Sequence, residues 1–227
     1  MSSPSIEHRD RVAILTLRRP TKRNALADAT VLSFEEFFRK PGADVRAVVL
    51  NAEGDHFSAG LDLGELTERS TEEALEHSLM WHRVFDTIEG GRVPVVAALK
   101  GAMIGGGLEL AASAHIRVAE PPTFSALPEG QRGLFVGGGG SVRIPRLVGA
   151  HRMADMMLTG RVLDAAEGHH RSQPLPHGGR RLRGVVDPHP CANGPRPEDE
   201  SGVVEGTWPA CRVRCGPGAV WGLSALS

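Results

Sequence analysis

The sequence of 227 residues lacks the features that mark several large classes of protein. No apolar run approaches the roughly 20 residues of a membrane-spanning helix. The N-terminal segment MSSPSIEHRD contains no hydrophobic core of a signal peptide. The formal net charge is −1, which argues against a general binder of nucleic acids or of membrane surfaces. We therefore expect a cytoplasmic protein with neither nucleic acid nor membrane as its partner.

Tyrosine is absent and cysteine is scarce. All three cysteines, Cys191, Cys211 and Cys215, lie in the last quarter of the chain, so the preceding part owes nothing to disulfides. With His189 they are the candidates for a metal site, but their spacing fits no zinc module well. We expect no metal.

The chain also has no Gly-x-Gly-x-x-Gly fingerprint and no glycine loop ending in Gly-Lys-Ser/Thr, so no nucleotide phosphate site is indicated. What it has is an apolar strand at 93–99, glycines at 105–107 and a short apolar helix that carries Glu109. Glycines let a ligand approach backbone N–H groups, and the first N–H groups of a helix favour negative charge. A carboxylate one turn further on is suited to proton transfer. The alternative is a tight turn before a solvated glutamate.

Hydrophobic periodicity predicts strands that alternate with helices, which indicates an α/β fold. Ser70 and Glu73 have the spacing of a capping box, and we expect the apolar stripe of the following helix at Leu75, Leu79, Phe85 and Ile88. The expected strands are 12–17, 45–50, 93–99 and 115–118, and the expected helices are 29–39, 70–90, 108–114 and 150–158.

The character of the chain changes near residue 169. Residues 169–227 hold half of the prolines and show no apolar periodicity. Such a segment cannot offset its ordering entropy by burial. We expect a core over residues 1–168 and an atypical, disordered or non-native tail over residues 169–227. Its Arg-Pro-Gly-His-Cys bias leads to the hypothesis that the tail is a frameshift product.

Four sequence pieces in residues 8–168 occur in a recognisable order. They are Arg19-Pro20 with Asn24-Ala25-Leu26, then FSAGLDL at 57–63, GGGLE at 105–109, and Pro128-Glu129 followed by a glycine-rich turn and PRLVG at 145–149. Together they resemble the crotonase superfamily of enoyl-CoA hydratases and isomerases. The resemblance implies an α/β spiral of β-β-α units, with the C-terminal helical region missing or replaced.

The resemblance also implies an active site. Backbone N–H groups of Leu61 and Gly106 would bind the thioester oxygen of an acyl-CoA, where they would stabilise an enolate. Glu109 and Glu129 match the two glutamates of the hydratases and would share the acid and base roles. The alternatives are a surface helix glutamate at Glu109 and a loop carboxylate at Glu129.

Coenzyme A enters this interpretation as part of the substrate, and no separate cofactor is implied. The resemblance places CoA contacts on two loops and on the glycine turn, while Asp62 more readily fixes its own loop. The expected CoA-binding residues are Arg23, Asn24, Ala25, Leu26, Ala59, Gly60, Leu61, Asp62, Leu63, Gly105 and Gly106. Lys22 and Arg23 are either phosphate ligands or part of a solvated basic loop. Glycines 137–140 are expected to form a close-packed turn near Glu129, and His56 to be structural.

The favoured function is enoyl-CoA hydratase, which adds water syn to a trans-2-enoyl-CoA and gives a 3-hydroxyacyl-CoA. One alternative is an enoyl-CoA isomerase or another acyl-CoA lyase or hydrolase on the same scaffold. Another is a truncated, inactive chain that only binds CoA. The resemblance further implies a homotrimer or a dimer of trimers, which the unusual C-terminus puts in question.

Overall fold

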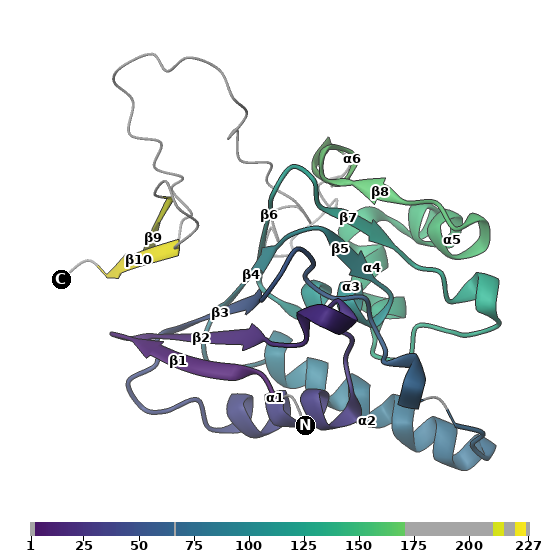
Figure 1. Cartoon of the computed structure of the whole chain (residues 1–227), viewed down its shortest axis with the longest axis horizontal. Coiled ribbons are helices and arrows are strands. Elements are labelled where there is room, and N and C mark those ends of the chain that lie inside the picture. Colours follow the sequence, from purple (N-terminus) through teal and green to yellow (C-terminus); the bar gives the residue numbers. More distant parts are fainter. Residues whose placement is uncertain (1–2, 66, 171–210, 216–220, 226–227) are drawn as a thin grey trace. The chain divides into compact units, whose positions relative to one another are not determined.

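The computed structural model describes residues 3–65, 67–170, 211–215 and 221–225 (Figure 1). The chain divides into two units, Met1–Pro190 and Cys191–Ser227. In the second unit, β9 (Cys211–Cys215) pairs antiparallel with β10 (Trp221–Ala225). All other helices and strands belong to the first unit.

A five-stranded sheet forms the first layer of the larger unit, and its strand order is β1-β2-β3-β4-β6. The first strand pairs antiparallel with the second, and the remaining neighbours are parallel. The strands are β1 (Ser5–Arg9), β2 (Val12–Leu17), β3 (Ala47–Ala52), β4 (Val95–Leu99) and β6 (Ile116–Ala119). Four of them confirm the strands expected from periodicity. β1 has mostly exposed, polar residues and therefore gives no such signal.

A second, smaller sheet holds strands that the sequence did not reveal. Its order is β5 (Ala102–Ile104), β7 (Phe124–Ala126) and β8 (Leu163–Asp164). β5 and β7 run parallel. The chain thus places one strand in the first sheet and the next in the second, and then forms a helix, as in β4-β5-α3 and β6-β7-α4. This repeat confirms the expected spiral of strand-strand-helix units.

The helices cover the sheets, and the four that periodicity predicts agree with their expected positions to within a few residues. The α-helices are α1 (Asp28–Arg39), α2 (Thr71–Glu89), α3 (Gly106–Ser113), α4 (Gly140–Val148), α5 (Ala150–Thr159) and α6 (Ala165–His170). Three 3-10 turns are η1 (Pro20–Lys22), η2 (Leu63–Glu65) and η3 (Gly130–Arg132).

Helix α2 begins at a complete capping box. The Ser70 hydroxyl accepts from the Glu73 N–H, and the Glu73 carboxylate accepts from the Ser70 N–H. The expected apolar stripe of α2 is wrong in its first half, because Leu75 and Leu79 are 59% and 55% exposed. The buried residues of this helix are Trp81, Val84, Phe85 and Ile88.

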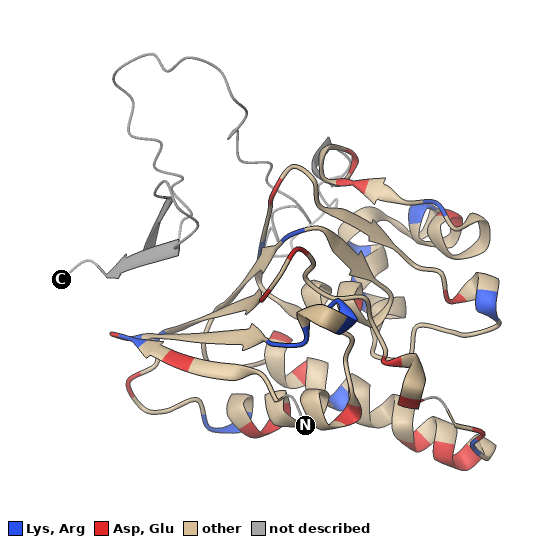
Figure 2. Cartoon of the chain, in the orientation of Figure 1, with Lys and Arg blue, Asp and Glu red and all other residues tan. Residues whose placement is uncertain are grey.

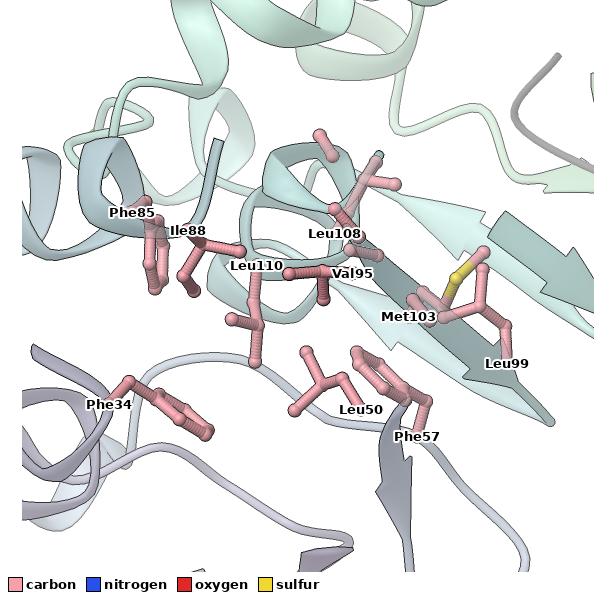
Figure 3. Close-up of a cluster of buried hydrophobic side chains, with 14 of the residues drawn as sticks. Phe34, Leu50, Phe57, Phe85, Ile88, Val95, Leu99, Met103, Leu108 and Leu110 are labelled. Atoms are coloured by element: carbon pink, nitrogen blue, oxygen red, sulfur yellow. The ribbon is translucent and has the colours of Figure 1, made fainter. Parts of the chain in front are cut away.

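The core lies between the helices and the sheets. Figure 3 shows Phe34, Phe85 and Leu110 from three helices pointing toward the strand residues Leu50 and Val95. Strands β2, β3 and β4 carry no charged residue, and Figure 2 shows the charges on helices, loops and other strands such as β1 and β8. Burial of this apolar surface is the main source of stability for the larger unit.

Several expectations for the C-terminal tail fall outside the described residues. Residues 171–210 are not among those described, so the disordered or frameshifted tail remains a prediction. The same holds for a metal site at His189, Cys191, Cys211 and Cys215, whose side chains are not described. Within the described side chains, no cluster of three or more His, Cys, Asp or Glu could hold a metal ion. None of the helices in the described part of the chain has the length and apolarity needed to cross a bilayer.

Candidate active site

The candidate site forms where three parallel segments of the second layer end. Ser58 forms an isolated parallel bridge with Met103 of β5, and β5 pairs in parallel with β7. The carboxyl ends of parallel strands meet at one edge of a sheet. The residues just beyond these ends are Leu61, Gly106 and Glu129, so the topology brings together three groups that are distant in sequence.

The backbone N–H groups of Leu61 and Gly106 are close neighbours. A Cβ built on Gly106 would lie 3.5 Å from the Leu61 nitrogen, and one built on Gly60 would lie 3.2 Å from the Gly106 nitrogen. Neither N–H has a hydrogen-bond acceptor within the described part of the chain. Gly106 opens α3, where the first N–H groups have no partner inside the helix. The two donors are therefore available to one anionic oxygen.

Glu109 lies in the first turn of α3 and is only 3% exposed. Its Oε1 accepts hydrogen bonds from the N–H groups of Gly138 and Gly140, each at 2.8 Å. Burial raises the pKa of the Glu109 carboxyl to about 7, the nearby Glu129 adds to this rise, and the two N–H donors oppose it. The turn at 137–140 was expected near Glu129, whereas its hydrogen bonds go to Glu109.

Glu129 follows β7 and is the N-cap residue of η3. Its Oε2 is buried and has no hydrogen-bond partner among the described residues, while its Oε1 lies against Gly105. Burial raises the pKa of the Glu129 carboxyl, and the charge of Arg132 opposes that rise. Two carboxyls with raised pKa values thus occur together, which is the condition for one to hold a proton and the other to accept one.

Both glutamates and both N–H groups border a cavity of about 680 Å³. Of the expected CoA-binding residues, those that line it are Arg23, Ala59, Gly60, Leu61, Leu63, Gly105 and Gly106. The walls also include apolar side chains such as Leu134 and Phe135 and the cation Arg69. The volume lies within the usual range of sites that bind small molecules.

The expected residues that do not line the cavity hold its loops in place. Asn24 is buried and bonds through its side chain to the backbone of Arg19, Glu53 and His56. Leu26 is buried and bridges to Leu61. Direct contact of Asn24, Ala25 and Leu26 with CoA stays a prediction. Because the side chains of Asn24 and Leu26 are buried, these two residues would contact CoA through backbone groups.

Asp62 fixes its own loop, as expected. Its carboxylate accepts from Arg19 at 2.7 Å, from Lys22 at 3.3 Å and from the Gly64 N–H at 3.1 Å. The hydrogen bond from Arg19 holds the pKa of the Asp62 carboxyl below its usual range. His56 is structural, since its Nδ1 accepts from the Ala102 N–H at 3.1 Å.

Sequence reasoning missed the contribution of α2 to the cavity. His77, Ser78 and Trp81 line it, and Ser78 bonds to the Gly137 carbonyl. The available signal was the spacing of His77, Trp81 and Phe85 on successive turns of one helix face. That spacing indicates a buried face but not a ligand-binding one.

Two backbone donors beside one buried and one half-buried carboxyl, set on a spiral of strand-strand-helix units, define a protein of the crotonase fold. The chain belongs to the enoyl-CoA hydratase/isomerase family, whose family model matches residues 7–171.

The curated relatives are larger proteins. The chain is 47% identical over 132 residues to the fatty acid oxidation complex subunit alpha of Shewanella loihica. The matched region covers 56% of this chain and 19% of that protein. It is 37% identical over 164 residues to the peroxisomal fatty acid beta-oxidation multifunctional protein AIM1 of Arabidopsis thaliana. That matched region covers 70% of this chain and 23% of the AIM1 protein. The chain therefore spans about a fifth of the length of these relatives.

Solved structures of more similar length share the fold. A proposed enoyl-CoA hydratase of Rhodopseudomonas palustris is 56% identical, with a TM-score of 0.73 over 81% of this chain and 70% of that one. A Thermobifida fusca protein of the same description, in complex with acetoacetyl-CoA, is 27% identical with a TM-score of 0.68, over 75% of this chain and 71% of that one.

Proposed function

We propose that this site hydrates a trans-2-enoyl-CoA, with syn addition of water, and yields a 3-hydroxyacyl-CoA. The observation that carries the proposal is the meeting of two unpaired N–H groups, the buried Glu109 carboxyl and the half-buried Glu129 carboxyl at one cavity in the described part of the chain. A site with the amides alone would suit many acyl-thioester reactions. The second carboxyl favours a reaction that needs one proton removed and another delivered.

The thioester oxygen would accept hydrogen bonds from the Leu61 and Gly106 N–H groups. Attack on Cβ of the conjugated thioester moves negative charge onto this oxygen as an enolate. Preformed donors in a water-poor site stabilise that charge, each by roughly 3 kcal/mol in comparable enzymes. Because the donors belong to the backbone, the Leu61 side chain remains free to line the cavity.

Glu109 and Glu129 would handle the protons as a pair. One carboxylate accepts a proton from water as the water oxygen bonds to Cβ, and the other carboxyl gives a proton to Cα. The raised pKa of Glu109, about 7, keeps a proton available near neutral pH. We assign these roles jointly, since strongly coupled carboxyls titrate as a unit. The substrate is neither oxidised nor reduced, so the proposed reaction needs no redox cofactor.

The CoA portion would extend over the rim formed by Arg23 and the loop at 59–63. Arg23 is exposed and lines the cavity, where its guanidinium is suited to a phosphate. Lys22, by contrast, bonds to Asp62 and helps to fix the loop. CoA compounds among the solved complexes of the family support this part of the proposal.

Hydration is tested with purified protein and a short trans-2-enoyl-CoA, whose conjugated thioester absorbs in the ultraviolet. We expect this absorbance to fall as the double bond is hydrated. A trans-3-enoyl-CoA provides the complementary assay, because isomerisation would create the conjugated absorbance. Gain of absorbance in the second assay without loss in the first would replace hydratase by isomerase. Binding without either change would identify an inactive, CoA-binding chain.

A further inference from the structure

Asp28, a carboxylate outside the predicted catalytic pair, lies between helix α2 and the segment that follows Leu61. Asp28 is the first residue of α1. Its Oδ1 accepts a hydrogen bond from the Trp81 indole N–H at 2.8 Å and lies 2.8 Å from His77 Nε2. A carboxylate only accepts, so His77 Nε2 is the donor in this contact. Arg69 lies 3.8 Å from the other oxygen of Asp28. The carboxylate thus orients two side chains of α2.

His77 and Trp81, together with Phe85, form an aromatic row along α2. This row packs against the turn at Gly106 and the turn at 137–140. Ring centroids are 6.0 Å apart for His77 and Trp81 and 5.7 Å apart for Trp81 and Phe85. A Cβ on Gly106 would lie 2.9 Å from the Trp81 ring, and a Cβ on Gly138 would lie 2.8 Å from the Phe85 ring. The row therefore contacts both the predicted oxyanion donor and the turn that bonds to Glu109.

The backbone of Asp28 bonds to the segment that follows the other predicted oxyanion donor, Leu61. Its N–H donates to Oε2 of Glu65 at 2.9 Å, and Glu65 ends the 3-10 turn that follows the Leu61 segment. The neighbouring Leu26 bonds to both sides of Leu61, with its N–H to the Gly60 carbonyl and its carbonyl to the Asp62 N–H. Asp28 thereby contacts Glu65, just after the Leu61 loop, through its backbone, and it contacts the Gly106 turn through Trp81.

We propose that Asp28 is a positioning residue that sets the geometry of the Leu61 and Gly106 donors. The inference rests on the proposed function of that donor pair. Trp81 is only 4% exposed, so loss of its acceptor would leave a buried indole N–H unpaired. The ring would then turn toward another partner and release its contact with Gly106. Small displacements of a donor strongly reduce its effect on a transition state.

The test uses full-length Asp28→Ala, Asp28→Asn and Trp81→Phe variants. In Asp28→Asn the side-chain carbonyl can still accept from Trp81 and His77, whereas the methyl group in Asp28→Ala cannot. Glu35→Ala is the matched control, because Glu35 also lies on α1 and ties it to α2 through Arg83, while its side-chain hydrogen bonds within the described residues, from Arg39 and Arg83, do not involve the aromatic row. Thermal unfolding identifies variants that merely lose stability.

In Asp28→Ala we expect kcat for hydration to fall about 10- to 100-fold, with KM changed less than about threefold. Asp28→Asn should recover most of this loss, and Trp81→Phe should lie between the two. Glu35→Ala should keep the wild-type kcat. Equal losses in Asp28→Ala and Glu35→Ala, or no recovery with asparagine, would overturn the positioning role.

A second readout separates this inference from the hydratase assignment. An enoyl-CoA with an electron-donating aromatic group at its far end absorbs at longer wavelength when its carbonyl oxygen is hydrogen-bonded. We expect this red shift on binding to the wild type and its loss in Asp28→Ala. A wild-type red shift without hydration would refute the hydratase assignment alone. An undiminished red shift in Asp28→Ala would refute the positioning role.

Discussion

Gly105 lies directly against the carboxylate of Glu129. A Cβ at this position would overlap Glu129 Oε1. Gly105 also has φ +51° and ψ −119°, a conformation that other residues rarely adopt. The glycine that precedes the Gly106 N–H is therefore the same residue that leaves room for the Glu129 carboxylate. The turn thus requires glycine at this position for two independent reasons, its backbone conformation and its contact with Glu129.

Substitution of this glycine should reduce activity more than its backbone strain alone explains. We expect Gly105→Ala to lower kcat/KM at least about tenfold, because the methyl group displaces Glu129. Gly133→Ala is the matched control, since Gly133 has φ +68° but nothing within 4 Å of its Cβ position. Steady-state hydration rates of both variants check the prediction. Similar rates for the two would show that the contact with Glu129 has no catalytic consequence.

The partly buried ion pair between Arg19 and Asp62 of the loop at 59–63 should matter for stability. Asp62→Asn weakens the bonds from Arg19, Lys22 and Gly64, and we expect a loss of about 1–3 kcal/mol in the free energy of unfolding. Glu53→Gln breaks the exposed pair with Arg18 and should cost less than about 1 kcal/mol. Urea unfolding of both variants measures the difference. A larger loss for Glu53→Gln would contradict the role given to Asp62.

The raised pKa of Glu109 predicts a specific dependence of stability on pH. Its ordinary pKa is 4.5, and in the folded chain it is about 7. Between these values the folded chain binds more protons than the unfolded chain, so the free energy of unfolding falls as pH rises. The total loss is roughly 3 kcal/mol. This loss is absent below pH 4.5 and complete above pH 7, the two pKa values of the carboxyl.

Glu109→Gln removes this dependence because the amide does not titrate. We expect its stability relative to the wild type to increase as pH rises from 4.5 to 7 and then to level off. Chemical unfolding of the two proteins across this range provides the measurement. A stability difference that stays constant with pH would show that Glu109 is not protonated preferentially in the folded chain.

Much of the fold could be predicted from periodicity, and the reasons for the misses are physical. Strand 12–17 alternates in burial, and the capping box at Ser70 marks the start of α2, so both were found. The strands β5 and β7 have three residues each, which is too short for an alternating pattern. Leu75 and Leu79 follow helical spacing but remain exposed, because spacing shows which residues share a face and not what covers that face.

The site could be predicted only as far as local motifs reach. The resemblance names the glycine turn and the two glutamates, and the structure places them at one cavity, while their catalytic roles stay a prediction. Asp28 and Trp81 are 53 residues apart and meet only through the packing of α1 on α2. No local pattern links them. The bond from Gly140 to Glu109 was likewise hidden, because a glycine-rich turn does not specify which acid its N–H groups will meet.

The central claim is that Glu109 and Glu129 act together in hydration, and the rates of two amide variants test it most directly. Wild type, Glu109→Gln and Glu129→Gln are compared with a short trans-2-enoyl-CoA, with the exposed Glu120→Gln as the control. Substrate binding is measured by calorimetry. We expect wild-type turnover and a loss of about 10²- to 10⁴-fold in kcat for each of the two variants, with acyl-CoA binding largely kept. Full activity in either variant would remove that glutamate from the mechanism and contradict the account.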